Sequence, residues 1–193
     1  LTCEMQLSTA EGVSYPYAVY FDRYNVALEE KRDLPLWRWR RSCCVTGKVH
    51  GEMVRVFDDS ANGKYSDIGD DSVAVGRSEV ASHLSGLIVL KGKLYEFRVD
   101  PFGRWCEARP YEGETGNLNA FKEFDKEPRR LREPLAFVVK HKDDSDVLID
   151  IAREEDCPVP VGEYELELAI LSDRVFVQEG DSDNVAVEAG KTT

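Results

Sequence analysis

Apolar and polar residues alternate along most of this chain, in short runs separated by Gly, Pro, Asp and Asn. A period of two is typical of strands with one buried face, whereas the 3.6-residue period of an amphipathic helix is scarce. Only the segment 23–31 favours a short helix. The pattern therefore predicts an all-β, antiparallel, β-sandwich-like fold with little helix. The expected strands include the runs 3–7, 15–21, 36–45, 53–57, 73–75, 135–139, 147–152, 164–171 and 175–177.

A hairpin is predicted in the middle of the chain. The apolar runs 87–90 and 94–99 flank the turn sequence Lys91-Gly92-Lys93, and glycine between two such runs is a hairpin signal. The sequence Asp100-Pro101-Phe102-Gly103 then has the residues that a type I turn prefers. We expect a three-stranded meander from Leu87 to Arg109.

Two packed β subdomains are expected. The segment 111–117 is rich in turn residues and is the best candidate boundary. It divides the chain into a β domain at 1–112, a smaller sandwich-like subdomain at 113–179 and a loose tail at 180–193. The second part, about 80 residues long, is small for independent stability and should pack on the first.

The charge of the chain excludes some partners. A net charge of −12 and an isoelectric point near 4.8 argue against binding to nucleic acid or to an anionic membrane. No apolar run approaches the length of a membrane span. The first residue is Leu rather than Met, which we interpret as a removed leader or a fragment. The charge favours an exported protein or one that collects divalent cations.

The chain has five cysteines, Cys3, Cys43, Cys44, Cys106 and Cys157. An odd number leaves at least one unpaired or bonded to another chain. If the protein is exported, we expect a disulfide from Cys3, Cys106 or Cys157, with Cys43 or Cys44 as the partner. Buried thiols are the alternative.

An acidic stretch follows the run 53–57. From Asp58 onward, oxygen-bearing residues recur at alternate positions, and a glycine follows at once. Alternate ligands with a glycine that allows a sharp turn are the pattern of the first half of a calcium loop. Gly69 stands where an EF-hand has its bidentate Glu, so closure would come from Asp67, Asp70 or Asp71. The expected ligands are Asp58, Ser60, Asn62, the Lys64 carbonyl, Asp67 and Asp71. The alternative is an acidic turn that water solvates without an ion.

The motif Asp58-x-Ser60-x-Asn62-Gly63-x-Tyr65-x-Asp67, followed by Gly69-x-Asp71, resembles acidic Asp/Asn-Gly calcium loops in bacterial extracytoplasmic β-rich proteins. The phrases Gly92-Lys93-Leu94-Tyr95 and Pro110-Tyr111-Glu112-Gly113 resemble uncharacterised members of the same group. The resemblance implies an exported all-β protein with a metal-stabilised loop and no assigned catalysis.

Catalytic signatures are absent from the sequence. The three histidines, His50, His83 and His141, stand alone in their segments, and no nucleophile elbow is present. Core or surface positions are their expected places.

A second candidate site is a strand with alternating aromatic and basic residues. Trp37 and Trp39 share one face of the expected strand, and Arg38 and Arg40 share the other. Two indoles on one face could form a platform for a sugar ring. The alternative, which solvation favours, is that both tryptophans fill the core while the arginines face water.

The sequence therefore predicts a non-catalytic, exported β protein with a calcium-stabilised loop and a structural or adhesive role at the cell envelope. The alternative is a carbohydrate-binding module or an accessory domain of a polysaccharide-processing enzyme. The expected partners are an envelope protein, a polysaccharide or another copy of the chain.

Overall fold

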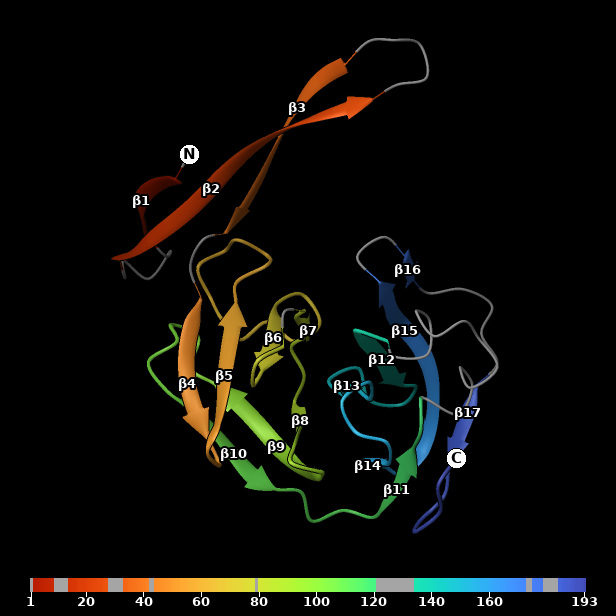
Figure 1. Cartoon of the computed structure of the whole chain (residues 1–193). Coiled ribbons are helices and arrows are strands. Elements are labelled where there is room, and N and C mark those ends of the chain that lie inside the picture. Colours follow the sequence, from red (N-terminus) through yellow and green to blue (C-terminus); the bar gives the residue numbers. More distant parts are fainter. Residues whose placement is uncertain are drawn as a thin grey trace.

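The computed structural model describes residues 2–8, 14–27, 33–41, 44–78, 80–120, 134–172, 175–178 and 184–193, with side chains for 44–78, 80–120, 134–170 and 184–193. Every regular element in these residues is a strand, and the strands pair antiparallel in several sheets (Figure 1). The predicted all-β, sandwich-like fold is confirmed. No helix long and apolar enough to cross a membrane occurs in the described residues.

The first sheet contains the strands β1 (Thr2–Ser8), β2 (Ser14–Ala27) and β3 (Asp33–Arg41), in that order. The helix expected at 23–31 is wrong over residues 23–27, which belong to β2 and pair with 33–37 of β3. The physical reason is that alternation continues from the preceding run, so cross-strand pairing overrides a weak helical preference. The backbone of β3 confirms the strand expected around Trp37 and Trp39.

The N-terminal half packs two sheets face to face. One sheet contains, in order, β4 (Val45–Val49), β5 (Glu52–Phe57), β6 (Ser72–Val75) and β7 (Ser82–His83). The other is the predicted meander of β8 (Leu87–Leu90), β9 (Lys93–Val99) and β10 (Cys106–Pro110). Alternate residues from both sheets, including Val54, Val56 and Phe97, form one core cluster. This alternation is why the strands were visible in the sequence.

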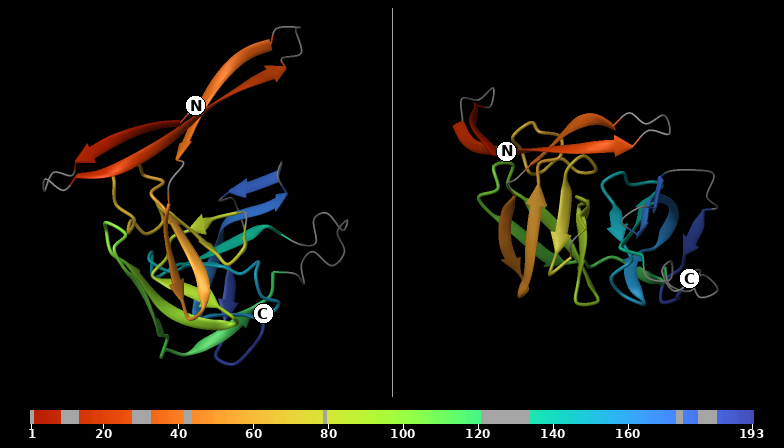
Figure 2. Two further views of the ribbon diagram at one scale, coloured as in Figure 1. Left: turned by 60° about the vertical axis from the view of Figure 1, so that its left-hand side comes forward. Right: turned by 45° about the horizontal axis from the view of Figure 1, so that its top comes forward.

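The C-terminal half lies beside it (Figures 1 and 2). Its sheets contain β11 (Thr115–Leu118), β12 (Ala136–His141), β13 (Leu148–Asp150), β14 (Cys157–Pro160), β15 (Gly162–Ser172), β16 (Val175–Gln178) and β17 (Val185–Val187). β14 pairs with β11, and β12 and β17 both pair with β15. Cys157, Val159 and Tyr164 are fully buried in its core, and the Tyr164 hydroxyl donates a hydrogen bond to the Pro160 carbonyl at 2.8 Å.

The loose tail expected at 180–193 is wrong for residues 184–193. β17 pairs with β15, and Val187 is buried in the C-terminal core. Beyond it, Thr193 N donates to Asn117 O at 2.9 Å. Val187 is buried whereas Val185 is exposed, so the burial of Val187 together with the pairing of β17 offsets the entropy cost of ordering a terminus.

The hairpin β8–β9 contributes to both cores. Leu87, Val89 and Leu94 belong to the C-terminal cluster, whereas Ile88 and Leu90 belong to the N-terminal one. Successive side chains of a strand point to opposite faces, so β8, with all four residues buried, contacts one core with each face, whereas β9 also exposes Glu96 and Arg98. The boundary placed at 112/113 stays a prediction, and the C-terminal core draws on side chains that precede it.

The turn of this hairpin has two residues, Lys91 and Gly92, because Leu90 pairs with Lys93. Both have positive φ, 53° and 70°. Such a turn matches the right-handed twist of the strands that it joins.

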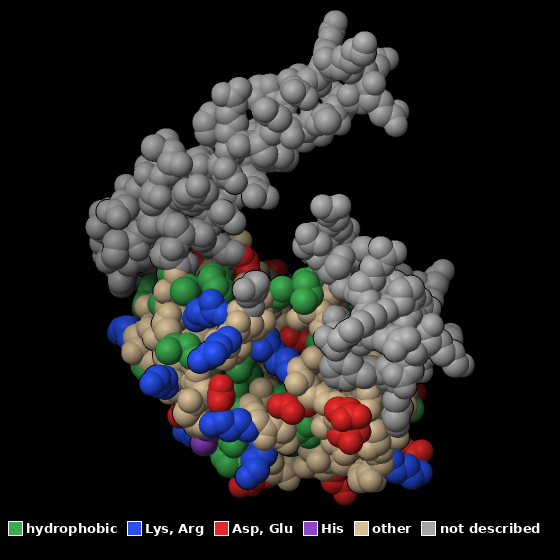
Figure 3. Space-filling view, viewed as in Figure 1, with side chains coloured by type: hydrophobic (Ala, Val, Ile, Leu, Met, Phe, Trp, Pro, Cys, Tyr) green, Lys and Arg blue, Asp and Glu red, His purple; other side chains and the backbone are tan. Residues whose placement is uncertain are grey.

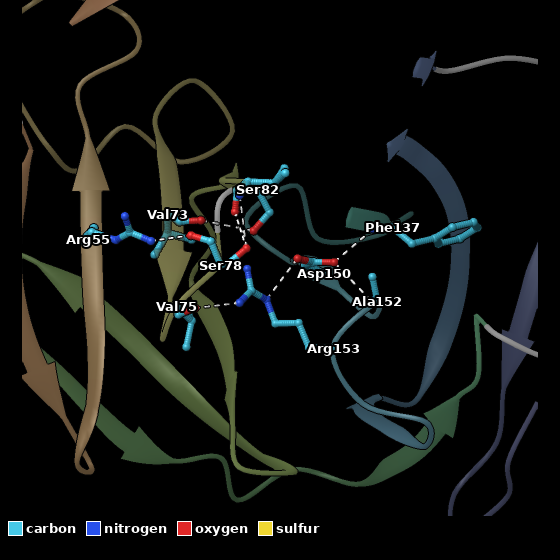
Figure 4. Close-up of polar contacts among 10 residues, drawn as sticks. Arg55, Val73, Val75, Ser78, Ser82, Phe137, Asp150, Ala152 and Arg153 are labelled. Carbon is cyan, nitrogen blue, oxygen red and sulfur yellow. Dashed lines mark hydrogen bonds and ion pairs between the residues drawn. The ribbon is translucent and has the colours of Figure 1, made fainter. Parts of the chain in front are cut away.

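Polar contacts join the two halves as well (Figure 4). Arg153 donates from Nη1 to the Val75 carbonyl at 3.0 Å and pairs with Asp150 at 3.1 Å. Ser85 Oγ donates to Asp146 O at 3.0 Å and accepts from Leu148 N at 3.0 Å. These bonds and the shared hairpin make the halves one packed body.

Charge is unevenly spread over the surface. On the face seen in Figure 3, Lys and Arg side chains gather over the N-terminal half. The net charge of −12 therefore does not describe every face of the molecule.

Candidate metal site in the acidic loop

The acidic loop, residues 58–71, connects β5 to β6. The strands pair up to Phe57 and Ser72, which brings the two ends of the loop, Asp58 and Asp71, together at the top of the sheet. Both carboxylates are buried, with exposed fractions of 1% and 0%. Buried acidic side chains are rare unless they are hydrogen-bonded or bind a cation.

Asp58 holds the first turn of the loop. Its carboxylate accepts hydrogen bonds from Gly63 N at 2.8 Å and from Asn62 N at 3.1 Å. Gly63 has φ of 84°, in the left-handed region that glycine adopts without strain. The sharp turn that the sequence indicated at this glycine is confirmed.

Asp71 holds the rest of the loop. Its carboxylate accepts from Asp59 N and from Asp67 N, each at 3.0 Å. Burial raises the pKa of Asp71 to about 6, the hydrogen bonds from the backbone of Asp67 and Ser60 lower it, and the charges of Asp58 and Asp67 raise it further. The neighbouring negative charges therefore add to the cost of ionising this group.

Three carboxylates converge on one hydroxyl. Ser60 Oγ lies 3.3 Å from Asp58 Oδ1, 3.4 Å from Asp67 Oδ2 and 3.5 Å from Asp71 Oδ1. A serine hydroxyl has a single proton to donate, so it can satisfy only one of these oxygens at a time. The carboxylates therefore repel one another, and a cation at this place would reduce that repulsion.

The other expected ligands lie in the same loop but turn elsewhere. Asn62 donates from Nδ2 to Asp67 Oδ2 and accepts from Lys64 N at 2.8 Å with Oδ1. In the described part of the chain, no three acidic, histidine or cysteine side chains stand around a common centre suited to a metal ion. Calcium binding would require the carboxylates to move from the Ser60 hydroxyl onto the ion.

Residues outside the motif anchor the loop. Leu84 exchanges backbone hydrogen bonds with it, donating to Asp71 O at 2.8 Å and accepting from Gly69 N at 2.9 Å. His83 Nδ1 lies 2.7 Å from Gly69 O, and Tyr65 is buried in the N-terminal core. The sequence placed Tyr65 outside the ligand shell, but it gave no signal for the contacts of 83–84, which depend on sheet pairing.

A second buried carboxylate, Asp100, stands in the turn that follows β9. Gly103 N donates to Asp100 O at 2.8 Å, which confirms the predicted turn. The Arg104 guanidinium binds the Asp100 carboxylate through two nitrogens, at 2.9 and 2.7 Å. Hydrogen bonds from the Arg104 side chain lower the pKa of Asp100 to about 2. Sequence reasoning found the turn and missed the arginine.

The histidines occupy separate places. His50 Nε2 lies 3.0 Å from Ala108 O, and its ring stacks on Tyr95. His141 accepts from Asp143 N at 3.1 Å and meets Tyr164 edge to face. Together with the contact of His83, these bonds give each imidazole a local structural partner.

Of the expected disulfide partners, Cys44, Cys106 and Cys157 are free thiols, so the only expected pairing that stays a prediction is that of Cys3 with Cys43. Burial raises the pKa of the Cys157 thiol well above its usual range, which keeps it unreactive. The side chains of Cys3 and Cys43 lie outside the described residues. So do those of Trp37, Arg38, Trp39 and Arg40, and the sugar platform proposed there stays a prediction.

Comparison of the chain with protein-family models, with curated proteins and with solved structures finds no match. The geometry of the chain's own residues is therefore the basis for its proposed function.

Proposed function

We propose that the chain is a non-catalytic β protein whose acidic loop binds one calcium ion and is stabilised by it. The observation that carries this proposal is the convergence of Asp58, Asp67 and Asp71 on the Ser60 hydroxyl. Oxygen donors of this kind are the ligands that calcium prefers. An ion at this place would replace repulsion among three carboxylates by attraction to a shared positive charge.

The wider role that we propose is structural or adhesive, outside the cytoplasm and at the cell envelope. The acidic composition and the loop motif support it, since extracellular calcium is abundant enough for weak sites of 10⁻⁴–10⁻³ M. Fractionation of the source cells, followed by detection with an antibody, tests the location.

Thermal melts in millimolar calcium and in chelator test the metal. Binding to the native state alone raises stability by about 0.4–1.4 kcal/mol when millimolar calcium meets a site with a Kd of about 10⁻³–10⁻⁴ M. The informative variant is Asp67→Asn, because Asp67 is only half buried and its carboxylate contacts Ser60 and Asn62. We expect this variant to fold and to lose the calcium-dependent rise in Tm.

Asp143→Asn is the matched control. Asp143 is exposed in the acidic turn 143–146 of the other half, so the variant removes the same charge away from the loop and should keep the full calcium response. Superimposed wild-type melts in calcium and in chelator would contradict the proposal. An equal calcium response in Asp67→Asn would place the ion elsewhere.

A further inference from the structure

Trp105, which directly precedes β10, is half exposed at 51%. It lines a surface hollow of about 200 Å³ whose apolar wall includes Ile68, Leu84 and Phe97. Ile68 is itself 37% exposed. Leu84 and Phe97 are buried, whereas Trp105 and Ile68 are exposed, so the hollow offers an accessible indole beside an apolar depression, which suits ligand binding. We call it the Trp105 hollow.

Two polar groups of the Trp105 hollow have unused hydrogen-bonding capacity. Arg98 and Ser66 line it, and neither side chain has a hydrogen bond or ion pair with another residue in the described part of the chain. By contrast, the nearby Arg104 is committed to Asp100. A free guanidinium offers five N–H donors in a fixed plane, and a serine hydroxyl both donates and accepts.

These groups define the chemistry of the occupant. It needs an apolar face to cover the indole and a rim of hydroxyls to meet the guanidinium and the serine. The net charge of −12 stays strongly negative even with one calcium ion bound, which disfavours the approach of an anionic ligand. A hollow of this volume, open on one side, accommodates a single ring whose other face stays in water.

We propose that the Trp105 hollow binds a neutral sugar ring of a polysaccharide, which stacks on the indole and hydrogen-bonds to Arg98 and Ser66. This site is distinct from the strand of Trp37 and Trp39. The groups that contact the ring are not proposed ligands of the ion, although Ser66 and Ile68 belong to the acidic loop.

A panel of neutral and uronic-acid oligosaccharides, six units long and immobilised on one array, tests the proposal. The full-length wild-type chain should retain neutral members. Trp105→Ala should weaken binding by about tenfold, the equivalent of about 1.4 kcal/mol, and Trp105→Phe should restore part of it because a smaller aromatic face remains. Arg98→Gln should weaken binding severalfold.

Arg77→Gln is the matched control, because Arg77 is also exposed and does not line the hollow. Chemical denaturation of each variant checks that it folds. If Trp105→Ala is unstable, Arg98→Gln still tests the proposal, because Arg98 is exposed and its substitution should leave the fold intact. Three outcomes would overturn the proposal: no neutral glycan retained, a preference for uronic-acid members, or full retention by both Trp105→Ala and Arg98→Gln.

Discussion

Asp71 and Asp100 are both buried aspartates in turns that leave β-strands, yet their pKa values move in opposite directions. Asp100 is neutralised by an arginine four residues later, and its pKa falls to about 2. Burial raises the pKa of Asp71 to about 6, and the charges of Asp58 and Asp67 add to that rise. Burial raises the pKa of both carboxyls, and at Asp100 the hydrogen bonds from Arg104 outweigh it, whereas Asp71 has no cation beside it among the described residues to do so. The negative charge of Asp100 is already paired with Arg104, whereas the acidic loop carries negative charge that a bound ion can compensate.

The largest expected effect comes from the glycines of the two turns. A Cβ at Gly103 would lie 2.3 Å from Val45 Cγ1, at a φ of +68°, whereas a Cβ at Gly69 has the same kind of φ and no atom within 4 Å. We expect Gly103→Ala to destabilise by about 3 kcal/mol, through steric overlap as well as backbone strain, and Gly69→Ala by about 1 kcal/mol. Urea denaturation measures both. Equal losses would show that the turn of Asp100 is no more tightly packed than the acidic loop.

Removing the Asp71 carboxylate is the next largest change. Asp71→Ala leaves Asp59 N and Asp67 N without their acceptor. Because those N–H groups are partly exposed and water can replace the acceptor in part, we expect a loss of about 2 kcal/mol in chelator. Asp70→Ala, at an exposed neighbour, should stay within about 0.5 kcal/mol of wild type. A neutral or stabilising Asp71→Ala would mean that repulsion in the loop outweighs its hydrogen bonds.

The smallest effect is the pH dependence of stability, where the two aspartates should have opposite slopes. Between about pH 4 and 6 the native state binds more protons at Asp71 than the unfolded chain does, so the free energy of unfolding falls as pH rises. Between about pH 2 and 4 the unfolded chain binds more protons at Asp100, so the free energy of unfolding rises with pH.

Difference profiles against Asp71→Asn and Asp100→Asn isolate each contribution, because the other carboxylates cancel. Calcium that binds the ionised loop should abolish the Asp71 slope. Arg104→Gln should return the pKa of Asp100 toward its ordinary value of 3.8, which NMR titration measures. An unchanged pKa of Asp100 in Arg104→Gln would show that Arg104 is not the cause of the lowered pKa.

Local patterns in the sequence predicted many of the strands, because a strand with one buried face alternates apolar and polar residues. The interpretation of 111–117 as turn-rich missed β11, which pairs with β14, because that pairing joins segments far apart in the chain. The hairpin of β8 and β9 and the turn at Asp100 followed from residues that are adjacent in the chain. The helix predicted at 23–31 is wrong over residues 23–27, which pair with β3. The loose tail predicted at 180–193 is wrong over residues 184–193, where β17 pairs with β15. In both places pairing with another strand determined the structure.

The site was predictable to a lesser degree. The sequence named the loop and its acidic residues, and the structure brings three of them to Ser60. The sequence gives no signal for the backbone hydrogen bonds of Leu84 or for the ion pair of Arg104 with Asp100, because both depend on how the chain folds around those residues. The Trp105 hollow depends on where the acidic loop, β9 and the start of β10 meet, which spacing along the chain does not reveal.

The two-residue turn at Lys91 and Gly92 has a consequence for the fidelity of folding. Hairpins form in about 1–10 μs, so we expect the alignment of β8 with β9 to be established early in folding. A slip by one residue would send Leu87 and Val89 toward the N-terminal core and Ile88 toward the other, since each face of this hairpin serves a different half. One misaligned hairpin would therefore disrupt the packing of both cores. The positive φ angles at Lys91 and Gly92 favour the two-residue turn, and that turn fixes the register on which both cores depend.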